Sequence, residues 1–355
     1  MDIRADASLA KDGDVSPRTV VFVLVPNFSM IAFSSAIEPL RIANRLHGTQ
    51  LYRWVVLSPD GNPAHASNGI VVNVDGSIGS YELPSSGGRE ADMVLVCGGL
   101  GSEHYKDAAL YAWLRRQERR SAYIGALCTG ASLLAAAGLL CGFKCVIHWE
   151  SLDGFTEAYP EIDVSSDLFV VDRNRITCAG GTAALDMIVY LIAEQHGKAL
   201  ATEVIEQCLA DRMRDPHDHQ RLSLSARVGI YSPNVLKAIE IMEAHIEDPI
   251  SQEDIALLLG LSCRQHERLF RRHTGMSPAH YYLKIRLKKA RHLLLQSELS
   301  ILEIALASGF VSASHFSKCY RGLYGKSPRD ERRPPAMDRM VPIKRNLRIS
   351  TPASP

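Results

Sequence analysis

The spacing of apolar residues changes once along this chain, and that change is the strongest constraint on its fold. Residues 18–200 alternate short β-branched or apolar runs with helix-like segments, whereas residues 234–328 carry only helical patterns separated by Gly, Ser and Pro. Alternation of strands and helices is typical of an open, mostly parallel α/β sheet with helices on both faces. The sequence therefore predicts an α/β domain followed by an all-α domain.

A polar stretch with two prolines, residues 211–233, separates the two patterns and shows neither strand-like nor helical spacing of apolar residues. We place a linker there, so that the first domain spans residues 18–210 and the second spans residues 234–333. Residues 334–355 are rich in proline and basic residues and are predicted to form a disordered tail. In the first domain, strands are expected at residues 19–25, 54–57, 70–74, 93–97, 123–127, 168–171 and 176–178, and helices at residues 31–46, 102–119, 129–140 and 182–194.

The composition indicates in which cellular compartment the protein works. Hydrophobic residues make up 46% of the chain, yet no stretch approaches the roughly 18 uncharged apolar residues of a membrane span. Residues 1–17 are polar and acidic, unlike a secretory signal. The eight cysteines are scattered singly, without zinc or disulfide spacing. We therefore expect a soluble cytoplasmic protein with reduced thiols, no metal, no cofactor and no membrane contact.

Charge is divided unevenly between the two domains. Residues 1–232 carry 20 Lys and Arg against 27 Asp and Glu, whereas residues 233–333 carry 16 against 11. Phosphates attract a basic domain and repel an acidic one, so this asymmetry favours nucleic-acid binding by the second domain. The same charges would also suit an ordinary solvated surface.

Two similar helix-turn-helix patterns lie in the second domain. Each has a short capped helix, a turn at a glycine (Gly260 or Gly309), and a second helix with a serine cap. A long basic helix at residues 281–296 joins them, and such a connector can hold two recognition helices about one turn of DNA, roughly 34 Å, apart. One chain is thus predicted to read two adjacent major grooves of a promoter operator. The side chains expected to contact DNA are Arg264, Gln265, Arg268, Ser312, Ser314, His315, Lys318 and Arg321.

Residues 250–328 resemble the DNA-binding domain of the AraC/XylS family. The most specific matches are R-L-F-R-R-H-T-G-M-S-P at residues 268–278, I-A-L-A-S-G-F-V-S-A-S-H-F-S-K-C-Y-R at residues 304–321 and G-K-S-P at residues 325–328. His266 stands where this family usually has an apolar residue, and we interpret it as a partly buried histidine with a satisfied partner; the alternative is a pH sensor. The resemblance implies a transcription regulator, usually an activator, that works with RNA polymerase as a homodimer.

In the first domain, an apolar strand ends at Cys128 and a helical pattern begins at once, with Gly130 in the turn. This order is typical of a nucleophile elbow, in which a thiol and free helix N-terminal amides face the crevice above a sheet. Such a crevice could carry out covalent chemistry or bind an anion at Cys128, Thr129 and Gly130.

The first domain resembles the class I glutamine amidotransferase-like superfamily of the PfpI type. The matches are G-A-L-C-T-G-A at residues 125–131, V-I-H-W-E at residues 146–150 and T-C-A-G-G-T-A-A-L-D-M at residues 177–187. This resemblance implies a flavodoxin-like, open parallel sheet. Regulators of the GlxA type join such a domain to an AraC-type DNA-binding domain, in the order found here.

The resemblance also bears on chemistry at the elbow. Catalytic relatives of the PfpI type carry a His directly after the elbow Cys, where this chain has Thr129, although His148 could stand in as a base and the superfamily places a carboxylate at Glu38. We therefore favour a ligand sensor that is not an enzyme. The alternatives are a cysteine-dependent hydrolase or deglycase with a DNA-binding appendage, and an inert dimerising domain.

Regulators similar to this chain control catabolism of glycine betaine, dimethylglycine, carnitine and arginine, so the resemblance implies a betaine-like or amino-acid effector. Its carboxylate would bind the amides at residues 128–130, and its cationic end would lie against Phe28 or Trp149, near His148. Both aromatic residues could instead be core, and Glu38 could face either the pocket or solvent.

Overall fold

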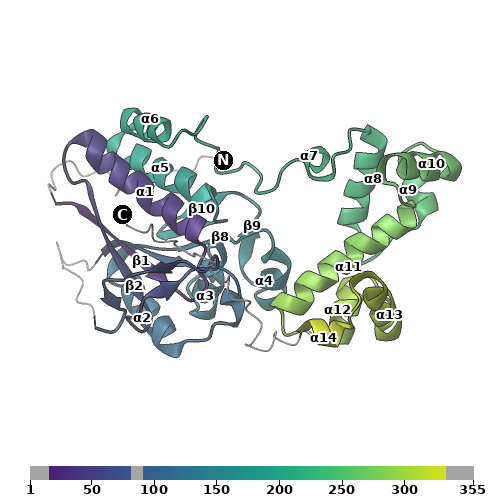
Figure 1. Cartoon of the computed structure of the whole chain (residues 1–355), viewed down its shortest axis with the longest axis horizontal. Coiled ribbons are helices and arrows are strands. Elements are labelled where there is room, and N and C mark those ends of the chain that lie inside the picture. Colours follow the sequence, from purple (N-terminus) through teal and green to yellow (C-terminus); the bar gives the residue numbers. More distant parts are fainter. Residues whose placement is uncertain (1–15, 81–90, 333–355) are drawn as a thin grey trace, which may run out of the picture.

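The first domain of the computed structural model, which describes residues 16–80 and 91–332, is built on a seven-stranded sheet (Figure 1). The strands pair in the order β10-β11-β7-β6-β1-β2-β5, and every neighbouring pair is parallel except β10 with β11. This arrangement confirms the predicted open, mostly parallel sheet. The bounds are β1 (Arg18–Leu24), β2 (Tyr52–Ser58), β5 (Gly76–Ser77), β6 (Ala91–Cys97), β7 (Ser121–Leu127), β10 (Phe169–Asp172) and β11 (Arg175–Cys178).

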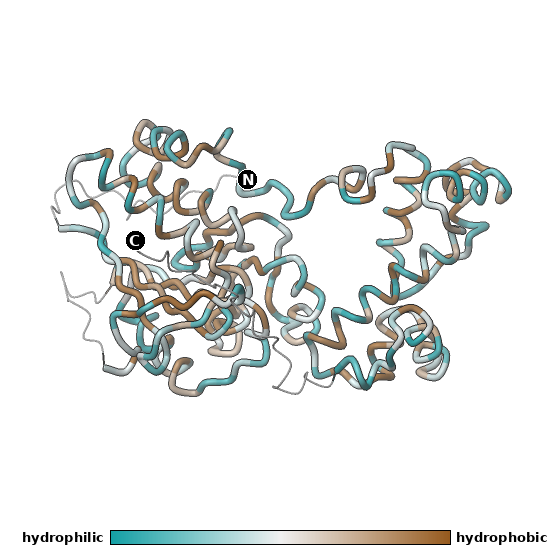
Figure 2. The backbone as a smooth tube through the Cα atoms, in the orientation of Figure 1, coloured by the Kyte–Doolittle hydropathy of each residue, from teal (hydrophilic) through white to brown (hydrophobic). Residues whose placement is uncertain are grey.

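Helices cover both faces of this sheet, because the strands bury side chains on both sides. In β1, Phe22 and Leu24 face one layer while Val21 and Val23 face the other. The sheet is accordingly the most hydrophobic band of the molecule (Figure 2). The first layer holds α1 (Met30–His47), α5 (Ala183–His196) and α6 (Lys198–Gln207); the second holds α2 (Ala108–Glu118), α3 (Ala131–Ala136) and α4 (Leu152–Ala158).

Three predicted elements of the first domain differ from the structure. The helix expected at residues 129–140 begins as the 3-10 turn η3 (Cys128–Gly130), and its α-helical part, α3, ends at Ala136. The strand expected at residues 70–74 is only β4 (Val71–Val72), which pairs with β3 (Ala64–His65) outside the main sheet. The helix expected at residues 102–119 is split into η2 (Ser102–His104) and α2, because Asp107 caps the second piece. A further small pair, β8 (Lys144–Val146) with β9 (Asp163–Ser165), lies beside β10 and β11.

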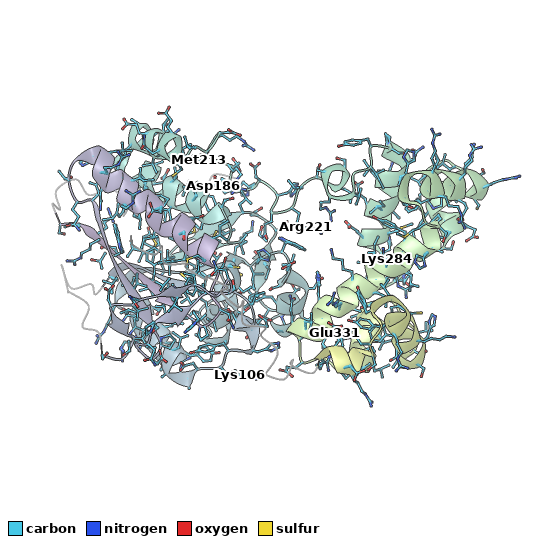
Figure 3. The ribbon with its side chains drawn as sticks, viewed as in Figure 1. Lys106, Asp186, Met213, Arg221, Lys284 and Glu331 are labelled. Atoms are coloured by element: carbon cyan, nitrogen blue, oxygen red, sulfur yellow. The ribbon has the colours of Figure 1, made fainter. Side chains whose placement is uncertain are left out.

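The segment predicted as a linker, residues 211–233, is divided between the two domains: its first part is fixed to the first domain, whereas Leu224, Val228 and Ile230 pack with the core of the second domain. Arg214 binds the buried carboxylate of Asp186 on α5 at 2.6–2.9 Å, and the Gln220 amide donates to the carbonyl oxygens of Ile147 and Asp167. Figure 3 shows Asp186 with the linker residue Met213 beside it. A short helix, α7 (Leu224–Val228), interrupts the rest of the segment. The tail predicted at residues 334–355 lies outside the described residues.

The second domain is all-helical, as predicted. Its elements are α8 (Pro233–Ala244), α9 (Gln252–Leu258), α10 (Cys263–Thr274), α11 (Pro278–Gln296), α12 (Ile301–Ala307), α13 (Ala313–Tyr324) and α14 (Pro328–Arg332). Two separate hydrophobic clusters form on α11: Tyr282 packs with Ile255 and Phe270, and Leu294 packs with Phe316 and the residues around it. Each helix-turn-helix therefore has its own small core. Among the described helices, none is both long and apolar enough to cross a membrane.

Candidate DNA interface and effector site

The first recognition helix, α10, presents a basic outer face. Arg264 and Arg268 are exposed, whereas Phe270 is fully buried against the core. Ser262 caps the helix, and the Gln265 side-chain oxygen accepts from the Ser262 amide at 2.9 Å. That oxygen is therefore engaged in a capping box, and only the Gln265 amide nitrogen remains for a base edge.

The second recognition helix, α13, presents a similar face. Ser314, Lys318 and Arg321 are exposed and line a shallow groove along the helix. Ser312 is the N-cap, and its hydroxyl accepts a hydrogen bond from the His315 amide, so its side chain is occupied in capping the helix. The structure thus gives capping roles to two residues predicted to read DNA, Gln265 and Ser312, and leaves the arginines and the lysine free to do so.

The connector α11 fixes the two motifs at its two ends (Figure 1). It has 19 residues, which at 1.5 Å per residue gives a length of about 28 Å. Arg286 on α11 donates to the carbonyl oxygens of Ser308 and Gly309 at 3.0 and 2.5 Å, and lies 4.3 Å over the Phe310 ring. Arg286 therefore holds the turn of the second motif in place. Sequence reasoning missed this role, because nothing distinguishes Arg286 from the other basic residues of the helix.

His266 is 2% exposed on the inner side of α10. Its Nε2 lies 3.3 Å from the side-chain oxygen of Gln252, and its ring packs edge-on against Phe270. Burial lowers the pKa of His266, which favours the neutral ring. The structure places this histidine in the partnered, buried position that the sequence suggested.

The elbow in the first domain has the strained geometry that its sequence indicated. Cys128 has a φ of 59°, in the left-handed region that non-glycine residues rarely adopt. Three glycines allow close packing around the elbow: an added Cβ at Gly98 would lie 2.3 Å from the Gly130 backbone nitrogen, one at Gly130 would lie 2.3 Å from the Val96 carbonyl oxygen, and one at Gly180 would lie 2.7 Å from the Cys128 Cβ. These close approaches explain why both the G-A-L-C-T-G-A and T-C-A-G-G segments carry glycine.

The surroundings of the elbow thiol disfavour its thiolate form. Burial raises the pKa of Cys128 to about 11, although a hydrogen bond from the Thr129 amide partly offsets this. The Thr129 hydroxyl, in the place of the catalytic histidine, donates to the Gly99 carbonyl at 2.6 Å. His148 Nδ1 accepts from the Glu150 amide, and burial lowers the pKa of His148. Within the described residues, no hydrogen bond joins His148 to Cys128.

The raised pKa predicts a pH dependence for alkylation of Cys128. Only the thiolate reacts, and with a pKa of about 11 it makes up about one part in ten thousand at pH 7. Its reaction with iodoacetamide should therefore accelerate about tenfold per pH unit between pH 7 and 9. Peptide mass spectrometry follows this, with the exposed Cys141 as a fast-reacting control. A plateau below pH 8 would contradict the assignment.

Two residues predicted to contact an effector lie elsewhere. Phe28 is fully buried and packs edge-on against Phe33 at 5.8 Å, so it is a core residue. Glu38 is exposed on the outer side of α1, where it pairs with Arg41 at 2.7 Å. The carboxylates whose charges act on the Cys128 thiol are Glu103 and Glu150. Glu103, in η2, was missed because its sequence neighbours carry no motif.

Trp149 faces the second domain. The Arg221 guanidinium lies 4.7 Å over its ring, and Lys288 and His292 of α11 lie at 6.0 and 6.5 Å. Figure 3 shows Arg221 between the two domains. A ring face already covered by an arginine is poorly placed to receive an effector's cation, so Trp149 is better described as part of the domain contact.

That contact is direct and close. Helix α4 packs on the C-terminal end of α11, where Gly154 leaves so little room that a Cβ would lie 2.9 Å from the Gln296 Cβ (Figure 1). His104 Nε2 lies 2.8 Å from the Leu295 carbonyl oxygen. Because η2 also packs against the elbow turn, η3 (Cys128–Gly130), only a few residues separate the elbow from the connector helix.

Fold and surfaces together define a two-domain DNA-binding protein: a PfpI-like domain in contact with a double helix-turn-helix. A family profile described as "DJ-1/PfpI family" matches residues 18–194, and one described as "Helix-turn-helix domain" matches residues 255–334. The HTH-type transcriptional regulator GbdR of Pseudomonas aeruginosa is 42% identical over 337 residues, which cover 94% of this chain and 90% of GbdR.

Two further relatives also match this chain over most of their length. The regulator CdhR of Pseudomonas aeruginosa is 43% identical over 311 residues, covering 88% of this chain and 90% of its own. The regulator GlxA of Rhizobium meliloti is 40% identical over 313 residues, covering 88% and 94%. The chain belongs to the AraC-type transcription regulators of the GlxA kind, which carry a DJ-1/PfpI domain before their helix-turn-helix domain.

Proposed function

We propose that this regulator binds a promoter operator through both helix-turn-helix motifs, reads two adjacent major grooves, and responds to a small betaine-like or amino-acid effector bound beside the elbow. It would activate catabolic genes as a homodimer together with RNA polymerase, in the cytoplasm, without enzymatic activity. The observation that carries the DNA-binding part is the pair of exposed basic faces, on α10 and α13, at the two ends of one helix.

The contact between the domains supports a ligand response. A ligand shifts a protein between two states only if it binds them with different affinity. A molecule that moves η2 or the loop carrying Trp149 would change the contacts that His104 and Trp149 make with α11. The elbow is therefore placed where binding could alter how the two recognition helices are presented.

DNA recognition is tested by Arg268→Ala and Lys318→Ala in the full chain. Each side chain is exposed on a recognition helix, and losing a bidentate base contact weakens specific binding by about 1–3 kcal/mol, or roughly 5- to 150-fold. Gel-shift titration against the operator measures this. Lys198→Ala, an exposed lysine of the first domain, is the matched control and should leave affinity unchanged. Equal losses on operator and random DNA would assign both residues to phosphate contacts only.

The Cys128→Ala variant distinguishes ligand sensing from the enzyme alternative. Sensing predicts that glycine betaine, dimethylglycine, carnitine or arginine still raises the melting temperature of the variant and still changes promoter output. A hydrolase or deglycase predicts instead a turnover of amide or glyoxal substrates that disappears with the thiol. An inert first domain predicts no response to any metabolite in either protein.

A further inference from the structure

The turn glycines of the two helix-turn-helix motifs have different surroundings. Both have left-handed backbones, with φ angles of 65° at Gly260 and 76° at Gly309. Among the described residues, an added Cβ at Gly260 would meet no other segment within 4 Å. One at Gly309 would lie 2.3 Å from the Ile246 carbonyl oxygen and 2.5 Å from the Pro249 Cγ. The left-handed backbone favours glycine at both positions, but only Gly309 also makes room for another segment.

That other segment belongs to the first motif. Ile246 and Pro249 lie in the α8–α9 loop (residues 245–251), and α9 is the first helix of the first motif. The turn of the second motif therefore rests directly on the first motif. Ser308, just before the turn glycine, is fully buried. Because the two motifs have separate hydrophobic cores, this contact is a second connection between them besides α11.

Helix α11 holds the α8–α9 loop through two side chains. Tyr282 is 4% exposed, and its hydroxyl donates to the His245 carbonyl oxygen. Seven residues further along the helix, and so on the same side of it, the Lys289 ammonium lies 2.8 Å from the Glu247 carboxylate. The Glu247 side chain is 63% exposed, and an ion pair of this kind contributes little. The buried tyrosine is thus the main anchor of the loop.

Arg286 lies between those two side chains and holds the turn of the second motif. Its guanidinium donates to the carbonyl oxygens of Ser308 and Gly309, and it lies over the Phe310 ring. Tyr282 and Arg286 are four residues apart, so they share a face of α11. One face of the connector therefore binds both sides of the contact, and the missing side chain of Gly309 lets the two sides meet.

Two motifs in fixed contact suit only one arrangement of DNA. The recognition helices α10 and α13 enter adjacent major grooves where two sequence elements lie about one helical turn, roughly 34 Å, apart. One base pair added between the elements moves the second by about 3.4 Å and rotates it by about 34° around the duplex. Motifs joined by a helix alone can follow this change through a small bend of the helix, whereas motifs seated on each other must break their contact.

We propose that Gly309, Arg286 and Tyr282 are positioning residues that make the chain selective for the separation of the two sequence elements in its operator. They seat the turn of the second motif on the α8–α9 loop and do not touch DNA themselves. This inference rests on the proposed function, because it requires that both motifs read the same duplex. It adds a source of specificity that the base-reading side chains do not supply.

The test is selection of bound duplexes from a random-sequence pool by the full chain, followed by sequencing. The parent should enrich two sequence elements at one separation. In gel-shift titration, one base pair inserted between the elements should weaken parent binding at least about tenfold, because the base contacts of one motif are displaced. Gly309→Ala pushes the turn off the loop, so it should enrich a spread of separations and reduce this penalty to about threefold or less.

Gly260→Ala is the matched control. It carries the same kind of backbone cost for a left-handed alanine but meets no other segment, so it should keep the parent's separation and penalty. If Gly309→Ala loses the calorimetric transition of the second domain, Tyr282→Phe and Arg286→Lys carry the test. The first removes the hydroxyl and keeps the ring, and the second keeps the charge without the paired donors. An unchanged separation and penalty in both overturns the proposal.

The proposal is also overturned if folded Gly309→Ala keeps the parent's separation and penalty, if Gly260→Ala spreads the separations equally, or if the parent itself tolerates the inserted base pair. A parent that enriches only one element overturns the two-groove reading, and this inference with it. A parent that enriches two elements, beside a folded Gly309→Ala that enriches them at the same separation, overturns only the present inference.

Discussion

Replacing Phe316 with alanine is expected to destabilise the second helix-turn-helix by about 3–5 kcal/mol. The ring is fully buried and packs against Phe310 at 5.3 Å and Tyr320 at 5.6 Å, in a core that only a few helices share. So small a core cannot close over the space left by an aromatic ring. In a domain of this size the loss lowers the melting temperature by about 12 °C or more, and operator binding should fail because α13 loses its inner face.

Differential scanning calorimetry of the full chain measures this effect, with a transition for each domain. Val311→Ala is the matched control: it is also an apolar truncation at the same turn, but the Val311 side chain is 91% exposed. Surface truncations usually change stability by less than about 0.5 kcal/mol. Equal behaviour of the two variants would show that Phe316 does not anchor the recognition helix.

Gly130→Ala is expected to disrupt the elbow at a cost of about 3 kcal/mol or more. A Cβ at this position would lie 2.3 Å from the Val96 carbonyl oxygen, and the obstacle is the backbone of β6, which cannot move aside as a flexible side chain can. The turn must shift away from the strand and take Cys128 with it. Any ligand response that depends on the elbow should disappear, while the second domain keeps its own transition.

Thermal unfolding of the first domain, followed by calorimetry, reports this change. Gly79→Ala is the matched control, because the nearest atom to its added Cβ is the Ser77 hydroxyl at 3.8 Å, an ordinary contact. The elbow geometry is refuted if Gly130→Ala melts with the parent protein.

Much of the fold was predictable because the relevant interactions are local. The continuous β-branched run of β1 marks a strand buried on both faces, and it pairs in parallel on both sides. Ser262 and Ser312 cap the helices that follow them, each through a hydrogen bond to the residue three positions ahead. Such contacts depend on sequence neighbours alone. The split of the helix expected at residues 102–119 also had a local sign, the cap at Asp107.

The site residues were likewise predictable only where they are neighbours in the sequence. Cys128, Thr129 and Gly130 belong to one continuous segment, so their sequence indicated the elbow. Glu38 lies ninety residues before Cys128 in the chain, and which side of α1 it occupies is set by the packing of α1 on α5 and α6. A superfamily position could suggest a carboxylate near the thiol, but the structure supplies Glu103 and Glu150 there instead.

By itself the sequence determined the two periodicities, and with them an α/β domain followed by two capped helix-turn-helix motifs on a basic connector. Only the tertiary structure decided that Trp149 faces the connector helix beneath the Arg221 guanidinium. It also decided that Gln296 packs directly against Gly154, where a side chain would not fit, and that an acidic cavity lies where the domains meet. The physical reason is distance along the chain. Caps and strand patterns are set by neighbouring residues, whereas contacts between segments far apart in the chain exist only once both domains have folded and docked.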